Sequence, residues 1–180
     1  MMFCGTRFNA YLLVAIAMGL VCGCSTEKGR QKKQLASLRI HMEVNPDNPN
    51  SETATIGHSG ASLNVESEPF LTEGHVKEAS VVDTPGGYAL EITFGKQGGR
   101  LLEQYTTANR GKHMAIFCRF VTPPEKKLNS GRWLAAPLIR QRIGDNKLTF
   151  TPEATREEAE GIAQGLTNIG KKMNPLEPKW

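Results

Sequence analysis

The chain has 180 residues and a formal net charge of +4, with 22% charged residues and 39% hydrophobic residues. The mild charge and the lack of an aromatic-basic cluster argue against nucleic acid as a partner. The length fits one ordinary domain that can bury its own core, with a short leader before it.

The N-terminus is typical of a bacterial lipoprotein. Arg7 is the only charge before the apolar run "AYLLVAIAMGLV", which leads into "LVCGC". This sequence resembles a lipobox, so we predict a signal peptide over 1–23 and a covalent lipid on Cys24. Ordinary cleavage and an uncleaved anchor are alternatives. A transmembrane helix is disfavoured, because residues 10–24 would reach only about 22 Å, against roughly 30 Å for a bilayer core.

Cys22 and Cys24 could instead form a metal or redox pair. The remaining cysteines, Cys4 and Cys118, do not complete a tetrahedral ligand set with plausible spacing, and the four histidines are scattered. We therefore predict no metal and no cofactor apart from the lipid on Cys24. Cleavage before Cys24 would leave Cys118 as the only free thiol, with no disulfide, and would lower the net charge by one.

The predicted tether and the first elements follow the signal peptide. Residues 24–37 are expected to be flexible and basic, because "STEKGRQKKQLA" has four basic residues and one acidic residue. A folded domain is predicted over 38–172 and a tail over 173–180. "LRIHMEV" alternates strictly and predicts a half-buried strand over 38–44. The stretch rich in Pro, Asn and Ser that follows predicts a long surface loop over 45–62.

The later elements show two kinds of periodicity. Helices are predicted over 99–112 and 155–170, each with one apolar stripe. Thr155 and Glu158 form a capping box at the start of the second helix, and Gly170 is expected to end it. "TPGG" predicts a turn. Strands or extended pieces are predicted over residues 62–70, 76–83, 88–94, 113–120, 133–143 and 147–150.

Strands that look antiparallel, combined with two amphipathic helices, predict an α+β fold. Each helix can bury only one apolar stripe, so both should cover the same face of a sheet. We expect a two-layer domain with a small, mostly antiparallel sheet and two helices packed on one face.

Catalytic motifs are absent, apart from one near match. The sequence contains no P-loop, GxGxxG, CxxC or HExxH. "GHSGA", residues 57–61, resembles a nucleophile elbow around Ser59. That chemistry needs a strand before the serine and a helix after it, whereas here a polar loop precedes it and a strand-like segment follows. A serine hydrolase using Ser59 is therefore the weaker alternative.

Three motifs follow one another in the second half of the chain. They are a T-x-x-N helix end before "GKHMAIF", the segment "AAPLIRQRI" and the helix "TREEAEGIAQGL". Together they resemble the head of the first periplasmic domain of SecD and SecDF, accessory membrane proteins of bacterial protein export. The resemblance is strongest over 65–172. The matching residues are Thr106, Asn109, Gly111, Lys112, Ala115, Ile116, Ala136, Pro137, Ile139, Ile143, Thr155, Glu158, Ala159, Ile162, Ala163 and Leu166.

The departures from the family pattern guide the functional prediction. No second apolar run of about 20 residues follows, so the proton-driven membrane helices of the family have no counterpart here. The segment from Pro123 to Arg142 is longer and more basic than the family pattern. We predict a protein-binding site there, although Trp133 could equally be a core residue. The candidate binding residues are Arg132, Trp133, Arg140 and Arg142.

These observations predict a non-enzymatic protein of the bacterial envelope, anchored by lipid with its domain in the periplasm. Ser25 follows the lipidated cysteine, and a residue other than Asp there favours the outer membrane over the inner membrane. The resemblance implies that the head-like domain binds another envelope protein or an exported polypeptide. A structural envelope lipoprotein without an export role is the alternative.

Overall fold

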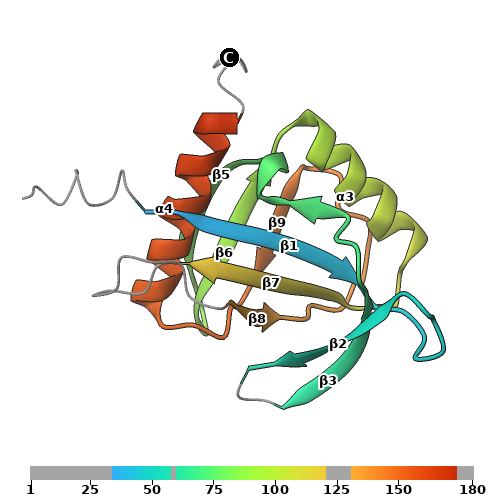
Figure 1. Cartoon of the computed structure of the whole chain (residues 1–180). Helices are drawn as coiled ribbons and strands as arrows, with labels where there is room; N and C mark the ends of the chain where they lie inside the picture. Colours follow the sequence, from blue (N-terminus) through green and yellow to red (C-terminus); the bar gives the residue numbers. More distant parts are fainter. Residues whose placement is uncertain (1–33, 58–59, 121–130, 174–180) are drawn as a thin grey trace, which may run out of the picture. The chain divides into compact units, whose positions relative to one another are not determined.

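The computed structural model describes residues 34–57, 60–120 and 131–173, all within the unit Gln31–Trp180. Nine strands, two α-helices and a short 3-10 helix occur in this described part (Figure 1). Its helices are too short or too polar to cross a membrane. The predicted signal peptide, the lipid site at Cys24 and most of the predicted tether lie outside it.

Six strands form one sheet, in the order β3-β2-β8-β7-β1-β4. Neighbouring strands of this sheet pair antiparallel, except that β2 and β8 are parallel and pair only at Ile56 and Trp133. The end of β1 also approaches β3, through a bridge between Glu43 and Val65, so the sheet curls. The strands are β1 (Ala36–Met42), β2 (Ser51–Ile56), β3 (Ala61–Glu66), β4 (Leu71–Thr72), β7 (Met114–Phe120) and β8 (Arg132–Ala135).

Three further strands form a second antiparallel sheet, in the order β5-β6-β9. They are β5 (Val76–Thr84), β6 (Gly87–Phe94) and β9 (Lys147–Phe150). The predicted "TPGG" turn joins β5 to β6, with Thr84 opposite Gly87. Gly87 has φ of +137°, a conformation that side chains other than glycine rarely adopt. The 3-10 helix η1 (Glu73–His75) leads into β5.

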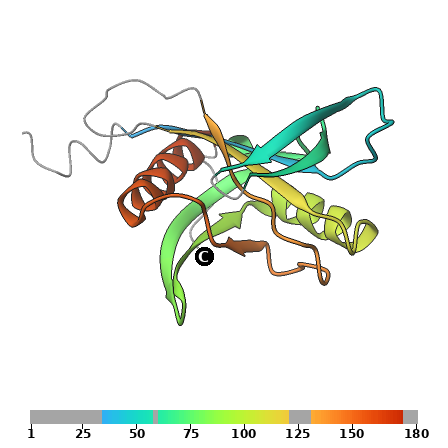
Figure 2. The same cartoon turned by 90° about the horizontal axis from the view of Figure 1, so that it is seen from below.

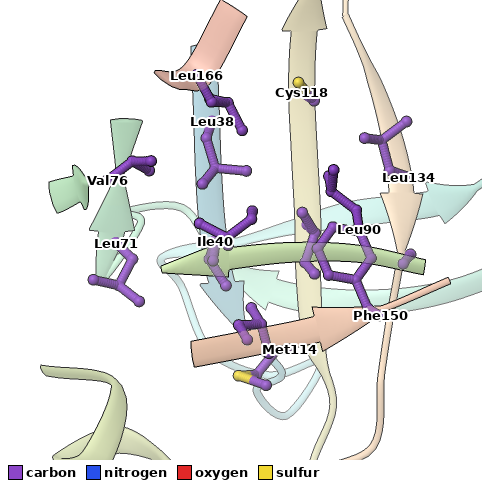
Figure 3. Packing of buried hydrophobic residues seen from close by; sticks show 14 of the residues in the cluster. Leu38, Ile40, Leu71, Val76, Leu90, Met114, Cys118, Leu134, Phe150 and Leu166 are labelled. Atoms are coloured by element: carbon purple, nitrogen blue, oxygen red, sulfur yellow. The ribbon is translucent and has the colours of Figure 1, made fainter. Parts of the chain in front are cut away.

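One hydrophobic core lies between the two sheets and the helices α3 (Lys96–Ala108) and α4 (Arg156–Met173). Alternate residues of β1 and β7 point into it, such as Leu38, Ile40 and Ile116, all at most 1% exposed. Figure 3 shows residues from both sheets meeting in this core. Both helices lie on the side of β1 and β7 that faces the three-stranded sheet (Figure 2). The predicted α+β fold is confirmed, with the strands divided between two sheets.

Helix α4 begins as predicted but ends later. The amide of Glu158 donates to the Thr155 hydroxyl at 3.2 Å, and the Glu158 carboxylate accepts from the Thr155 amide at 2.9 Å. This is the predicted capping box. The expectation that Gly170 ends the helix is wrong, because α4 continues to Met173. Gly170 lies inside the helix, where its lack of a side chain lets α4 approach the backbone of β5.

Residues of the sequence motifs tie the end of α3 to the segment after β8. The buried Thr106 hydroxyl donates to the Leu102 carbonyl at 2.7 Å and accepts from the Ile143 amide at 3.0 Å. The amide of Gly111 donates to the Ile139 carbonyl at 2.9 Å. These contacts satisfy buried polar groups, so the motif residues in them have a structural role.

The predicted surface loop over 45–62 is wrong over residues 51–56. Strand β2 forms there and pairs with β3 in a hairpin. Only Ala54 and Ile56 of β2 are buried. Four of its six side chains are polar, so the sequence carries little hydrophobic pattern to indicate a strand.

Candidate protein-binding site

The six-stranded sheet has a second face, opposite the core. Neither helix packs there, since both lie on the other side of β1 and β7 (Figure 2). Arg39 on β1 and Arg119 on β7 are exposed on this face, each between two buried core residues. Phe117 and Trp133 on the same face are partly exposed. We call Arg39, Phe117, Arg119 and Trp133 the outer patch.

The aromatic rings of the outer patch pack edge to face. The centroids of Phe117 and Trp133 are 5.2 Å apart with an interplanar angle of 68°, and His41 approaches Trp133 at 5.3 Å and 70°. Ala54, Val65 and Ala115 form a small buried cluster against Trp133. Trp133 is therefore neither a residue of the main core nor a fully exposed one. Its fixed, half-buried ring can offer apolar area to a partner at little cost in side-chain entropy.

His41 supports this face from beneath. Its side chain is only 3% exposed, and its Nδ1 lies 2.7 Å from the carbonyl oxygen of Glu66. A carbonyl can only accept, so Nδ1 carries the proton and donates to it. This hydrogen bond ties the end of β1 to β3 and holds the ring against Trp133. We therefore assign His41 a positioning role.

Two arginines flank the aromatic rings. Arg39 lies directly opposite Phe117 in the pairing of β1 with β7, and Arg119 lies opposite Ser37. Side chains opposite each other across neighbouring strands are within reach of one another. Partly buried aromatic rings beside arginines are the composition that protein interfaces favour. Basic charge at this face favours an acidic or polar rim on a partner.

Arg132 points to the other side of β8 from Trp133. Its Nη2 donates to the Glu158 carboxylate at 2.8 Å and to the Glu153 carbonyl at 3.3 Å, and its guanidinium lies 5.1 Å from the Phe120 ring centroid. Partial burial would raise the pKa of Glu158, but hydrogen bonds from Arg132 and Thr155 outweigh it and lower the pKa. Arg132 thus ties β8 to the start of α4.

The predicted binding residues therefore lie in three places. Trp133 belongs to the outer patch, and Arg132 contacts the start of α4. Arg140 and Arg142 are exposed on the segment after β8, where Arg142 pairs with Glu103 of α3 at 2.6 Å. The structure does not bring the four residues together, and their role in binding stays a prediction. Replacing Arg132 and Trp133 together would disturb a structural contact and the outer patch at once.

Sequence reasoning missed the other members of the outer patch. The alternation of "SLRIHM" and "MAIFCRF" could have placed Arg39, Phe117 and Arg119 on the face opposite the core. The missing information was the pairing of β1, β7 and β8, which joins distant parts of the chain.

The described residues offer little support for catalytic chemistry. Ser59 itself lies outside them, but strand β3 follows it instead of the helix that a nucleophile elbow needs. No group of three or more His, Cys, Asp or Glu side chains in the described part could hold a metal ion. Burial raises the pKa of the Cys118 thiol to about 12, so it stays protonated and unreactive at neutral pH.

Comparisons with known proteins point to one family. The family model for the SecDF P1 head subdomain matches residues 50–168. A solved structure described as "Structure and function of a membrane component SecDF that enhances protein export" is similar at 22% identity and a TM-score of 0.55, over 82% of this chain and 71% of that one.

A second structure, "Crystal structure of SecDF in Super-membrane-facing form", is similar at 21% identity and a TM-score of 0.54. The match covers 79% of this chain and 21% of that one, so this chain spans about a fifth of its length. At these identities the two structures show a shared fold. No curated protein matches the chain significantly.

Proposed function

The chain belongs to the SecDF P1 head subdomain family, and from this we propose that it is a non-enzymatic, lipid-anchored protein of the bacterial envelope that binds protein in a role linked to export. Its partner would be another envelope protein or an exported polypeptide. Because fold does not determine function, the proposal also needs a surface suited to binding. The outer patch supplies it, and this is the observation that supports the proposal most directly.

The lipid anchor would hold the domain close to a membrane. Cys24 follows a short apolar run and a small residue, and the tether after it carries an excess of basic residues. Several acyl chains attached to Cys24 would each contribute ~0.8 kcal/mol of membrane binding per buried CH₂, so together they would anchor the protein firmly. With Ser25 after the cysteine, we propose the outer membrane as the location, with the domain in the periplasm.

The Cys24→Ala variant is expected to lose its lipid and to remain as an unprocessed precursor or appear as a soluble form. Metabolic labelling of cells with a fatty-acid analogue measures this directly. Cys22→Ala is the matched control, because it removes the neighbouring thiol and leaves the proposed acceptor in place. A wild-type protein that takes up no label would contradict the anchor.

Reversing the charge of the outer patch, by Arg39→Glu with Arg119→Glu, is expected to reduce the capture of partner proteins at least about tenfold. The two arginines are exposed, so the free energy of unfolding should change little. Crosslinking in intact cells, followed by mass spectrometry of the captured proteins, measures the loss.

The matched control is Arg100→Glu with Arg110→Glu, which reverses the same charge at exposed positions on and just after α3. It should leave capture unchanged. Equal loss in both double variants would indicate a nonspecific effect of net charge. Unchanged capture in the outer-patch variant would remove this face as the binding surface. If wild-type crosslinking finds no partner, a structural role in the envelope becomes the better explanation.

A further inference from the structure

The predicted tether joins the folded domain at the start of β1, which also carries part of the outer patch. The carbonyl of Gln34 accepts a hydrogen bond from the Asn168 side chain of α4 at 3.0 Å, and β1 begins two residues later (Figure 1). Cys24, the proposed lipid site, lies about ten residues before Gln34, and a fully extended chain of that length spans at most about 35 Å. The anchor would therefore keep this end of the domain close to the membrane surface.

Arg39 and Arg119 lie near this junction and have no acidic partner. Arg39 is opposite Phe117 in the pairing of β1 with β7, and Arg119 is opposite Ser37. The two arginines are therefore diagonal neighbours on adjacent strands, where such positions are about 7–8 Å apart. Neither guanidinium forms an ion pair or a hydrogen bond with a residue in the described part of the chain. Two neighbouring positive charges without a partner favour a negatively charged ligand.

Apolar side chains lie beside the two arginines. Leu35, just before β1, is 40% exposed, and it is one of three large hydrophobic residues that are exposed in the described part of the chain. Phe117 and Trp133 are partly exposed. Gly131 lies so close to the Phe117 ring and the stem of Arg119 that a β-carbon would not fit, so these two side chains have a supported position.

This combination of side chains suits the interface between a membrane and water. The indole of a tryptophan prefers the headgroup level of a bilayer, because one part of it is apolar and its N–H is polar. A guanidinium binds phosphate through two parallel hydrogen bonds, which an ammonium group cannot do. The outer patch offers both kinds of group at the end of the domain that the tether joins.

We propose that the outer patch docks on the phosphate-bearing headgroups of the membrane that holds the anchor. Arg39 and Arg119 bind lipid phosphates, while Trp133 and Leu35 enter the headgroup layer beside them. The inference rests on the proposed lipid anchor and gives the outer patch a second ligand besides the proposed protein partner. The membrane and the partner compete for the same side chains, so a bound partner releases the domain from the membrane surface.

A second copy of this chain fits the outer patch less well than a lipid surface. A twofold contact between two copies would bring four guanidiniums together, and the residues of the outer patch include no acidic side chain to balance them. A bilayer instead supplies many phosphates side by side. It also adapts its surface to the patch and needs no matching shape.

Sedimentation with vesicles tests the docking. The protein is the mature chain, residues 24–180, which keeps the whole folded unit and carries Cys24→Ala so that no lipid anchors it. It should bind vesicles made of equal parts of phosphatidylcholine and phosphatidylglycerol, and should bind phosphatidylcholine alone more weakly. Neutralising the patch by Arg39→Gln with Arg119→Gln should lower binding to the anionic vesicles at least about tenfold.

Arg100→Gln with Arg110→Gln is the matched control, because it removes the same charge at exposed positions on and just after α3. It should bind the anionic vesicles as the wild type does. The basic tether is present in both double variants, so a difference between them isolates the outer patch. Equal loss in the two variants, or no loss in either, would overturn the docking. Thermal unfolding of both variants checks that they stay folded.

The fluorescence of Trp133 reports where the bound chain touches the lipid. The sequence has two tryptophans, so Trp180→Phe leaves Trp133 as the only one. Vesicles with brominated acyl chains should quench its emission, whereas the same vesicles without bromine should not. Unquenched Trp133 in a chain that sediments with the vesicles would show that another part of the chain binds the membrane, and the proposal would fail.

Two further comparisons separate the sources of phosphate and the two ligands of the patch. Inorganic phosphate should displace no more protein from vesicles than sodium chloride does at the same ionic strength, and stronger displacement would indicate a site for a free anion instead. If vesicles bind wild type and the Arg39 and Arg119 variant equally while that variant loses capture in cells, docking is wrong and the proposed protein binding stands. Vesicle binding that needs both arginines, with no partner captured in cells, would support docking and remove the protein partner.

Discussion

Leu166→Ala is expected to lower the free energy of unfolding by about 2–5 kcal/mol, because it removes a fully buried side chain from the main core. Leu166 is 0% exposed and lies near Leu38 of β1 (Figure 3). Helix α4 contacts strands of both sheets, so the neighbouring side chains are held in place from several sides. They cannot easily collapse into the space, and the cavity would persist. Thermal and urea unfolding measure the loss.

Lys172→Ala is the control on the same helix, since Lys172 is exposed and α4 extends past it. Its effect should stay within about 0.5 kcal/mol. If Leu166→Ala proved no more destabilising than Lys172→Ala, α4 would not pack on the core through the face described above. Because Leu166 is fully buried in the core and the two arginines of the outer patch are exposed on the opposite face of the sheet, the two sets of variants separate stability from binding.

The main strands of the fold could be predicted from sequence because their alternation is strong. In β1, Leu38, Ile40 and Met42 all face the core, and the strand pattern needs no other information. The capping box of α4 was equally local, since it involves two residues three positions apart. Strand β2 could not be predicted in this way. It packs only Ala54 and Ile56, and its pairing with β3 and β8 stabilises it instead.

The candidate site was harder to predict than the fold. Arg132 and Trp133 are adjacent in sequence, but neighbouring residues of a strand face opposite sides, so they cannot form one surface on β8. The outer patch depends on which strands lie side by side, and β1 and β7 are separated by more than 70 positions. The division of the strands between two sheets is hard to predict for the same reason. It is decided by contacts between distant segments that leave no local pattern.

Two glycines of α4 are explained by close packing against neighbouring strands and not by a helix end. Gly170 looked like a helix terminator, yet it lies within α4 at a close approach to β5. A β-carbon at Gly170 would lie 2.5 Å from the Val76 carbonyl oxygen, and one at Gly165 would lie 2.8 Å from the Ala36 β-carbon. Both positions therefore favour glycine because of the neighbouring strand, although glycine weakens an isolated helix.

Gly170→Ala and Gly165→Ala are accordingly expected to destabilise the protein by roughly 1–3 kcal/mol each, because the helix must shift away from β5 or β1. Gly161→Ala should instead stabilise it, by up to about 1 kcal/mol from helix propensity. A β-carbon at Gly161 would meet nothing closer than the side-chain Nε2 of Gln34, at 3.6 Å. The same substitution in the same helix thus has opposite expected signs, which urea unfolding of the three variants would measure. Stabilisation by Gly170→Ala would show that α4 does not pack closely on β5.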